Sequence, residues 1–260
     1  MPAPAASPAA SPPGLGVVDA VDSAALGERR VLNVWLPPGY DGSEARYPVI
    51  CLLDGSAHED YHHVSGLVQF CTMYERMPPS IVVGIANVDR YRDFTHPSAL
   101  AEDRERLPTG GGSAAFLAFV EHELLPHVEA RYRTDGRRTL IGQSMGGLLA
   151  TEVLVDHPEL FQDYVIVSPS LWWADRALLE RAPAAFAAHD LQGRRVFVCL
   201  GKEHPEMHDC ADELVQTLRQ HAPAVAVGYE TLADETHATV LHMAVYRALR
   251  FLYGASHPGL

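Results

Sequence analysis

The sequence has little positive charge and no long apolar run. Its 260 residues carry a formal net charge of −13 at pH 7, whereas a protein face that binds nucleic-acid phosphates must be basic. The same negative charge disfavours anionic membrane surfaces, and no stretch approaches the roughly 20 apolar residues that span a bilayer. We therefore expect a protein without nucleic-acid or membrane partners.

Targeting and metal-binding motifs are lacking as well. Residues 1–16 are rich in Ala, Pro and Ser, without the basic start and apolar stretch of a secretory signal. We expect a flexible tail there, followed by one domain over residues 17–260 and a cytoplasmic location. The four cysteines form no C-x-x-C pair, so we predict free thiols, no metal and no cofactor. Nothing in the sequence defines an oligomeric state.

Short apolar runs alternate with amphipathic segments from residue 29 onward. Runs that are apolar throughout are typical of strands in a parallel sheet that helices cover on both faces. The predicted strands are residues 29–36, 48–53, 80–86, 139–141, 164–167, 195–200 and 225–232. Helices are predicted over residues 113–130, 147–156, about 207–221 and 238–253. The first of these helices would begin with Ser113 as its N-cap. This order predicts an α/β protein with a mostly parallel, doubly wound sheet flanked by helices.

The sequence Gly142-Gln143-Ser144-Met145-Gly146 matches the pattern G-x-S-x-G. In this pattern the serine lies on a strained turn between a strand and a helix, and the glycines let the two backbones approach. A predicted strand precedes the motif and a predicted helix follows it, which argues against a simple glycine-rich packing turn. We predict Ser144 as a nucleophile and the amide of Met145 as a donor to an oxyanion.

A serine nucleophile needs a base within hydrogen-bond reach. In α/β hydrolases the chain order is serine, acid, histidine, so the base should follow the last strand. His237 lies in that loop, whereas His242 falls inside the final helix and His221 precedes the last strand. We predict His237 as the general base.

The acid that orients this histidine should follow the strand at residues 195–200. Glu203 comes first after that strand; Glu206 and Asp209 remain alternatives, because either could instead lie at a helix N-terminus. A Ser–His pair without an acid also stays open. The loop is rich in His and acidic residues, as is the segment 58–63. Neither contains a zinc-binding motif, so we predict polar loops rather than metal sites.

Five stretches occur in the order expected of one group of enzymes: YPVICLLDG, IVVGIANVDRYRDFTHPS, RTLIGQSMGG, VSPSLWW and DETHATV. Through them the chain resembles the esterase branch of the α/β hydrolases, which includes enterobactin-type siderophore esterases, esterase D-like enzymes and mycolyltransferases. The resemblance implies an α/β-hydrolase fold. The connections between the predicted elements are short, so we expect little or no lid.

The resemblance also implies further site residues. It gives the amide of Ser56 as the second oxyanion donor. It places Arg90 and Arg92 at the rim, where they would engage an anionic or catecholate-bearing substrate. It places Trp172 and Trp173 beside the acyl or leaving-group pocket. The alternatives are structural ion pairs for the arginines and packing under the loop for the tryptophans.

We predict a serine-dependent carboxylic-ester hydrolase that forms an acyl-enzyme on Ser144, with a small-molecule ester as substrate. Acyl transfer to an alcohol or sugar at the same site is one alternative. The other is a non-catalytic binding module on the same fold, although retention of both Ser144 and His237 favours an enzyme. With little or no lid we expect an open pocket, which would favour short or aromatic acyl esters.

Overall fold

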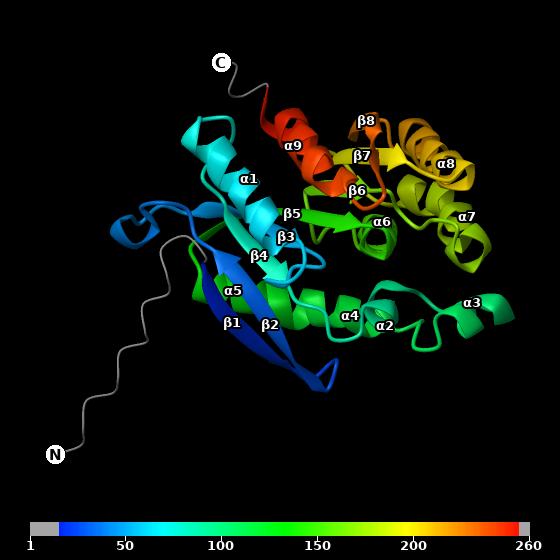
Figure 1. Ribbon diagram of the computed structural model, residues 1–260, viewed down its shortest axis with the longest axis horizontal. Coiled ribbons are helices and arrows are strands. Elements are labelled where there is room, and N and C mark those ends of the chain that lie inside the picture. Colours follow the sequence, from blue (N-terminus) through cyan, green and yellow to red (C-terminus); the bar gives the residue numbers. More distant parts are fainter. Residues whose placement is uncertain (1–15, 255–260) are drawn as a thin grey trace.

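A computed structural model describes residues 16–254 (Figure 1). The expected flexible tail, residues 1–16, therefore lies outside the described residues except for Gly16. The strands form one eight-stranded sheet in the order β1-β2-β4-β3-β5-β6-β7-β8. β1, β2 and β4 pair antiparallel, and every other neighbouring pair is parallel. This is the mostly parallel α/β-hydrolase sheet that the sequence predicts.

The strands differ in burial according to their place in the sheet. β3, β4 and β6 are buried along their whole length, as expected for apolar strands covered on both faces. β1 is half-exposed at the sheet edge, and its sequence VVDAVDS contains no continuous apolar run that would predict a strand. The strands are β1 (Val17–Ser23), β2 (Glu28–Trp35), β3 (Tyr47–Leu52), β4 (Ile81–Ile85), β5 (Thr134–Gln143), β6 (Asp163–Val167), β7 (Arg195–Lys202) and β8 (Ala226–Thr236).

Two helical layers enclose the sheet. α1 (Tyr61–Met73) and α9 (Val240–Tyr253) lie side by side on one face (Figure 1) and share one apolar core with it. The larger core on the other face contains residues of the longer helices α6 (Met145–Asp156), α7 (Trp173–Ala188) and α8 (Pro205–His221). The shorter elements are η1 (Tyr40–Gly42), α2 (Arg90–Phe94), α3 (Ala101–Arg106), α4 (Ser113–Phe119), η2 (Val120–Leu124) and α5 (Leu125–Arg131).

The predicted helix over residues 113–130 is interrupted. α4 passes into the π-helical turn η2 before α5 begins. The turn directs Glu123 toward the β1–β2 connection, where its carboxylate accepts the amides of Ala24 and Ala25 at 2.9 and 3.0 Å. The prediction that Ser113 is the N-cap is wrong: Gly112 holds that position, and the Ser113 hydroxyl instead donates to Glu152 at 2.9 Å.

The candidate functional residues follow the carboxyl ends of several strands. Parallel strands end on the same side, and ligands of α/β proteins bind at those carboxyl ends. Ser144 follows β5, Ser168 follows β6, Glu203 follows β7 and His237 follows β8. Asp54 lies just beyond the end of β3. Residues far apart in the sequence thereby meet at one site.

Candidate active site

Ser144 lies on a strained turn between β5 and α6. Its backbone has φ 60° and ψ −117°, a conformation that costs energy for any residue with a side chain. A Cβ at Gly142 would lie 2.2 Å from the carbonyl oxygen of Gly146, and one at Gly147 would lie 3.0 Å from Cα of Pro169. The glycines are therefore required by close backbone approach, and the turn presents the serine to solvent at the start of α6.

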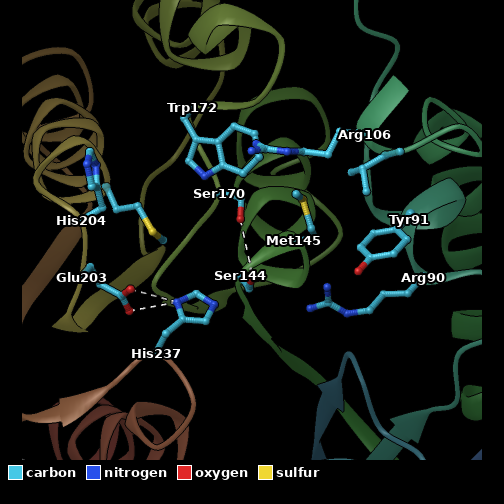
Figure 2. A pocket seen from close by; sticks show the side chains of 12 residues that line it. Arg90, Tyr91, Arg106, Ser144, Met145, Ser170, Trp172, Glu203, His204 and His237 are labelled. Carbon is cyan, nitrogen blue, oxygen red and sulfur yellow. Dashed lines mark hydrogen bonds and ion pairs between the residues drawn. The ribbon is translucent and has the colours of Figure 1, made fainter. Parts of the chain in front are cut away.

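His237 is held by Glu203. Its Nδ1 lies 3.0 Å from each carboxylate oxygen of Glu203, while Gln143 donates to the His237 carbonyl from the strand that carries the nucleophile. The Glu203 side chain is only 4% exposed, against 43% for His237. A carboxylate at Nδ1 keeps a proton on that nitrogen and leaves Nε2 as the acceptor. The imidazole points toward Ser144 (Figure 2).

The Ser144 hydroxyl contacts the hydroxyl of a neighbouring serine. Its Oγ lies 3.4 Å from Oγ of Ser170, and within residues 16–254 no hydrogen bond joins it to His237. At 3.4 Å the contact is longer than the usual 2.7–2.8 Å between hydroxyls, so it is weak and easily exchanged. Catalytic hydrogen bonds are often loose without substrate and tighten in the complex. Rotation about the Cα–Cβ bond of Ser144 redirects its hydroxyl.

The two predicted oxyanion amides differ in their surroundings. Met145 is the first residue of α6 and lines the pocket, so its amide is one of those that lack a partner within the helix. The amide of Ser56 instead donates to the Glu59 carboxylate at 3.1 Å, and Ser56 does not line the pocket in this structure. Ser56 stays a prediction, because its amide must first exchange Glu59 for the substrate.

Arg90 connects the loop after β3 to the strained turn that carries Ser144, here called the elbow. It makes two hydrogen bonds to the Asp54 carboxylate, at 2.6 and 2.9 Å, and one to the Gln143 carbonyl at 3.2 Å. Burial acts to lower the pKa of Arg90, but the hydrogen bonds and charge of Asp54 outweigh it, and the pKa is raised. Arg90 also lines the pocket, and its guanidinium is directed toward Ser144 (Figure 2). It is thus both an ion-pair partner and a pocket residue.

A cavity of about 600 Å³ lies above Ser144 and His237. Arg106, from α3, stacks over the ring of Trp172 at 5.4 Å, and the two form one wall (Figure 2). In the described part of the chain Arg106 has no acidic ion-pair partner, so its charge is available to a ligand. The lining residues are Arg90, Tyr91, Arg106, Leu107, Ser144, Met145, Ser170, Trp172, Glu203, His204, Met207 and His237.

Two residues predicted at the pocket lie elsewhere. Arg92 binds Glu28 at 2.7 Å and Asp93 at 2.8 Å, which fixes it as a structural ion-pair partner beside the β1–β2 hairpin. Trp173 is 1% exposed and donates its indole N–H to the His96 carbonyl at 2.8 Å, so it packs under the loop. We correct both expectations: neither residue lines the cavity in this structure.

The alternative acids also lie apart from the histidine. Glu206 and Asp209 belong to α8, and within residues 16–254 neither forms a hydrogen bond to His237. His204 accepts the Glu206 amide at 3.4 Å and caps the helix. The structure thus brings Glu203 to His237 and leaves the other two on the helix.

Neither polar segment assembles a metal site. The segment 58–63 is not wholly a loop as predicted, because α1 begins within it at Tyr61, whose ring is 1% exposed. Among residues 16–254, no three His, Cys, Asp or Glu side chains are placed to hold a metal ion. In the same part of the chain, no helix has both the length and the apolar character to span a membrane.

Several residues at the site were not predicted, including two charged or aromatic residues of the cavity wall and two serines after β6. Tyr91 and Arg106 line the cavity, but each lies in a short helix among several charged residues, and no local pattern marks it. Ser168 and Ser170 contact Glu203 and Ser144 respectively. Both lie in the stretch VSPSLWW, where their position after β6 was the available signal.

A serine on a strained strand–helix turn, beside a paired histidine and glutamate, is the architecture of an α/β hydrolase. The family described as "Putative esterase" matches residues 23–238. The ferri-bacillibactin esterase BesA of Bacillus subtilis is 30% identical over 259 aligned positions, covering 89% of this chain and 86% of the relative. The chain belongs to this esterase family, and it is a carboxylic-ester hydrolase.

Solved structures are similar over nearly the whole chain. A structure described as an IroE-like serine hydrolase from Shewanella oneidensis gives a TM-score of 0.84 at 29% identity, covering 92% of this chain and 80% of the other. The BES protein from Bacillus cereus gives a TM-score of 0.81 at 26% identity, covering 95% and 99%. These similarities support the α/β-hydrolase fold of the chain.

Proposed function

We propose that the chain hydrolyses esters through an acyl-enzyme on Ser144, with His237 as general base and Glu203 as the orienting acid. The observation that carries the proposal is the Glu203–His237 contact of 3.0 Å beside a serine at φ 60°. This combination leaves the imidazole Nε2 free to accept a proton on the side of the nucleophile. A non-catalytic module would not need this buried carboxylate.

The proposed reaction begins when the Ser144 hydroxyl turns from Ser170 to His237. Oγ attacks the ester carbonyl and passes its proton to Nε2, while the Met145 amide stabilises the oxyanion. The imidazolium then protonates the leaving alkoxide, and the acyl group remains on Ser144. Water then attacks this ester and passes a proton to His237. The imidazolium returns that proton to Oγ of Ser144 as the acyl–oxygen bond breaks, which releases the carboxylic acid and the free serine.

The pocket supports an aromatic, anionic or catecholate-bearing ester as substrate. Trp172 offers a flat apolar face, and Arg106 stacks over it without an acidic partner among the described residues. The Arg90 charge is already offset by Asp54. Arg106 is therefore the cation available to a negatively charged substrate. The name of the Bacillus subtilis relative supports a siderophore ester within this class.

The first test is hydrolysis of p-nitrophenyl acetate, butyrate and octanoate by wild type, Ser144→Ala and His237→Ala. We expect both variants to lose at least about a thousandfold in kcat/KM. Wild-type kcat/KM should fall at low pH, as expected of a reaction that needs a general base. A fluorophosphonate probe should label Ser144 in the folded wild type and should not label Ser144→Ala.

His242→Ala is the matched control for the histidine. It removes a second partly exposed imidazole, on α9, that does not line the cavity, and its activity should stay within about twofold of wild type. Full activity in folded Ser144→Ala or His237→Ala would contradict the proposed triad. Absence of labelling at Ser144 in active wild type would contradict the acyl-enzyme.

The substrate class is tested separately by comparing ferri-bacillibactin with p-nitrophenyl octanoate. We expect a higher kcat/KM for the siderophore ester, because it offers the charge that Arg106 can bind. A strong preference for the octanoyl ester would reject the siderophore substrate and leave the serine mechanism intact.

A further inference from the structure

The turn after β6 contacts the acid of the proposed triad. The hydroxyl of Ser168 donates to Oε1 of Glu203 at 2.6 Å, the same carboxylate that binds His237. Ser168 is fully buried, with φ 39°, a region that residues with a side chain rarely adopt. Its amide donates to the Cys199 carbonyl at 2.8 Å, which ties the turn to β7 just ahead of Glu203.

We infer that Ser168 is a positioning residue, whose hydroxyl holds the Glu203 carboxylate in the orientation that fixes the imidazole of His237. This inference rests on the proposed function, because it assigns Ser168 a role through the triad acid. Ser168 itself does not line the cavity and is not assigned any contact with substrate.

The surroundings of Glu203 explain why a second donor is needed. Its side chain is 4% exposed, and a buried carboxylate must be satisfied by hydrogen bonds. Among the described residues, its side-chain partners are the Ser168 hydroxyl and Nδ1 of His237. A hydroxyl on a carboxylate is a short, charge-assisted bond. Without it, the carboxylate can rotate, and its charge is balanced by the imidazole alone.

The sign of the pH effect follows from this charge balance. The Ser168 hydroxyl draws part of the carboxylate's negative charge away from His237. Its removal concentrates that charge on the imidazole and favours the protonated, inactive ring. The low-pH limb of kcat/KM should therefore move to higher pH when the hydroxyl is lost, while loss of orientation lowers kcat.

The experiment compares Ser168→Ala with Ser168→Gly. Both variants remove the hydroxyl, but glycine also relieves the positive φ that alanine must still adopt. We expect each to lower kcat about tenfold with KM nearly unchanged. Each should also move the low-pH limb of kcat/KM to higher pH. Recovery of wild-type kcat by Ser168→Gly alone would show a backbone effect and overturn the inference.

Two further measurements separate positioning from stability. Ser80→Ala removes another fully buried hydroxyl, which bonds the Pro78 carbonyl at 2.9 Å at the start of β4; it should leave the pH profile unchanged. In a Glu203→Ala background, Ser168→Ala should lower kcat by less than about a further threefold, because the carboxylate that its hydroxyl binds is already gone. A further tenfold loss there would overturn the inference. If wild type showed no esterase activity that depends on Ser144, the proposed function itself would be refuted.

Discussion

Replacing Arg90 with methionine removes its two hydrogen bonds to the buried Asp54 carboxylate. Loss of one partner of a buried ion pair costs about 3–5 kcal/mol. Here the Arg90 side chain is 29% exposed, and Asn87 still donates to Asp54 at 2.6 Å. We therefore expect the free energy of unfolding to fall by about 2–3 kcal/mol, which lowers Tm by roughly 5–10 °C for a chain of this size.

Urea unfolding followed by circular dichroism measures this loss. Arg29→Met is the matched control: Arg29 pairs with Asp22 at 3.0 Å, but the two side chains are 66% and 77% exposed, so it should cost less than about 0.5 kcal/mol. The double variant Arg90→Met/Asp54→Asn should be no less stable than Arg90→Met, because the unpaired charge is removed with its partner. Equal costs for Arg90→Met and Arg29→Met would refute the reasoning.

Three further predictions concern the cavity wall, one ion pair and one buried hydrogen bond. Arg106→Gln should raise KM for a negatively charged aromatic ester about fivefold and leave kcat and a neutral p-nitrophenyl ester unchanged, as steady-state kinetics would show. The pKa of Glu28 is lowered, chiefly by its hydrogen bond from Arg92, so its stabilising effect is present above the ordinary value of 4.5 and lost below it. The free energy of unfolding should consequently fall less steeply below about pH 4.5 in Glu28→Gln than in wild type, as denaturant titrations at several pH values would show. Trp173→Phe should cost about 1–2 kcal/mol in urea unfolding, because it leaves the buried His96 carbonyl without its donor; an unchanged midpoint would contradict that assignment.

The elbow could be predicted because its determinants are local. The glycines around Ser144 are required by backbone contacts between residues only a few positions apart, and the preceding apolar run predicts the strand. His237 and Glu203 could be predicted from the order of the strands alone, because the carboxyl ends of parallel strands lie on the same side of the sheet. The mostly parallel sheet follows from the same alternation of apolar runs and helices.

The corrected residues depend on contacts that chain order does not define. Arg92 finds Glu28 because the β1–β2 hairpin folds against the segment after β4, and β1 itself was not predicted. Trp172 and Trp173 are adjacent, yet one lines the cavity and the other is buried. The chain turns there through three consecutive left-handed residues, beginning at Ala174. No glycine marks this turn, so the sequence offered no sign of it.

The last strand has a consequence for how the enzyme loses activity. β8 lies at the sheet edge, pairs only with β7 among the described strands, and has no buried residue. Edge elements with little burial open at lower free energy than the centre of a domain. Detachment of this one strand would displace His237, the proposed general base, even if the turn at Ser144 and the central sheet remained folded. We therefore expect esterase activity to be lost at a lower denaturant concentration than the structure of the central sheet.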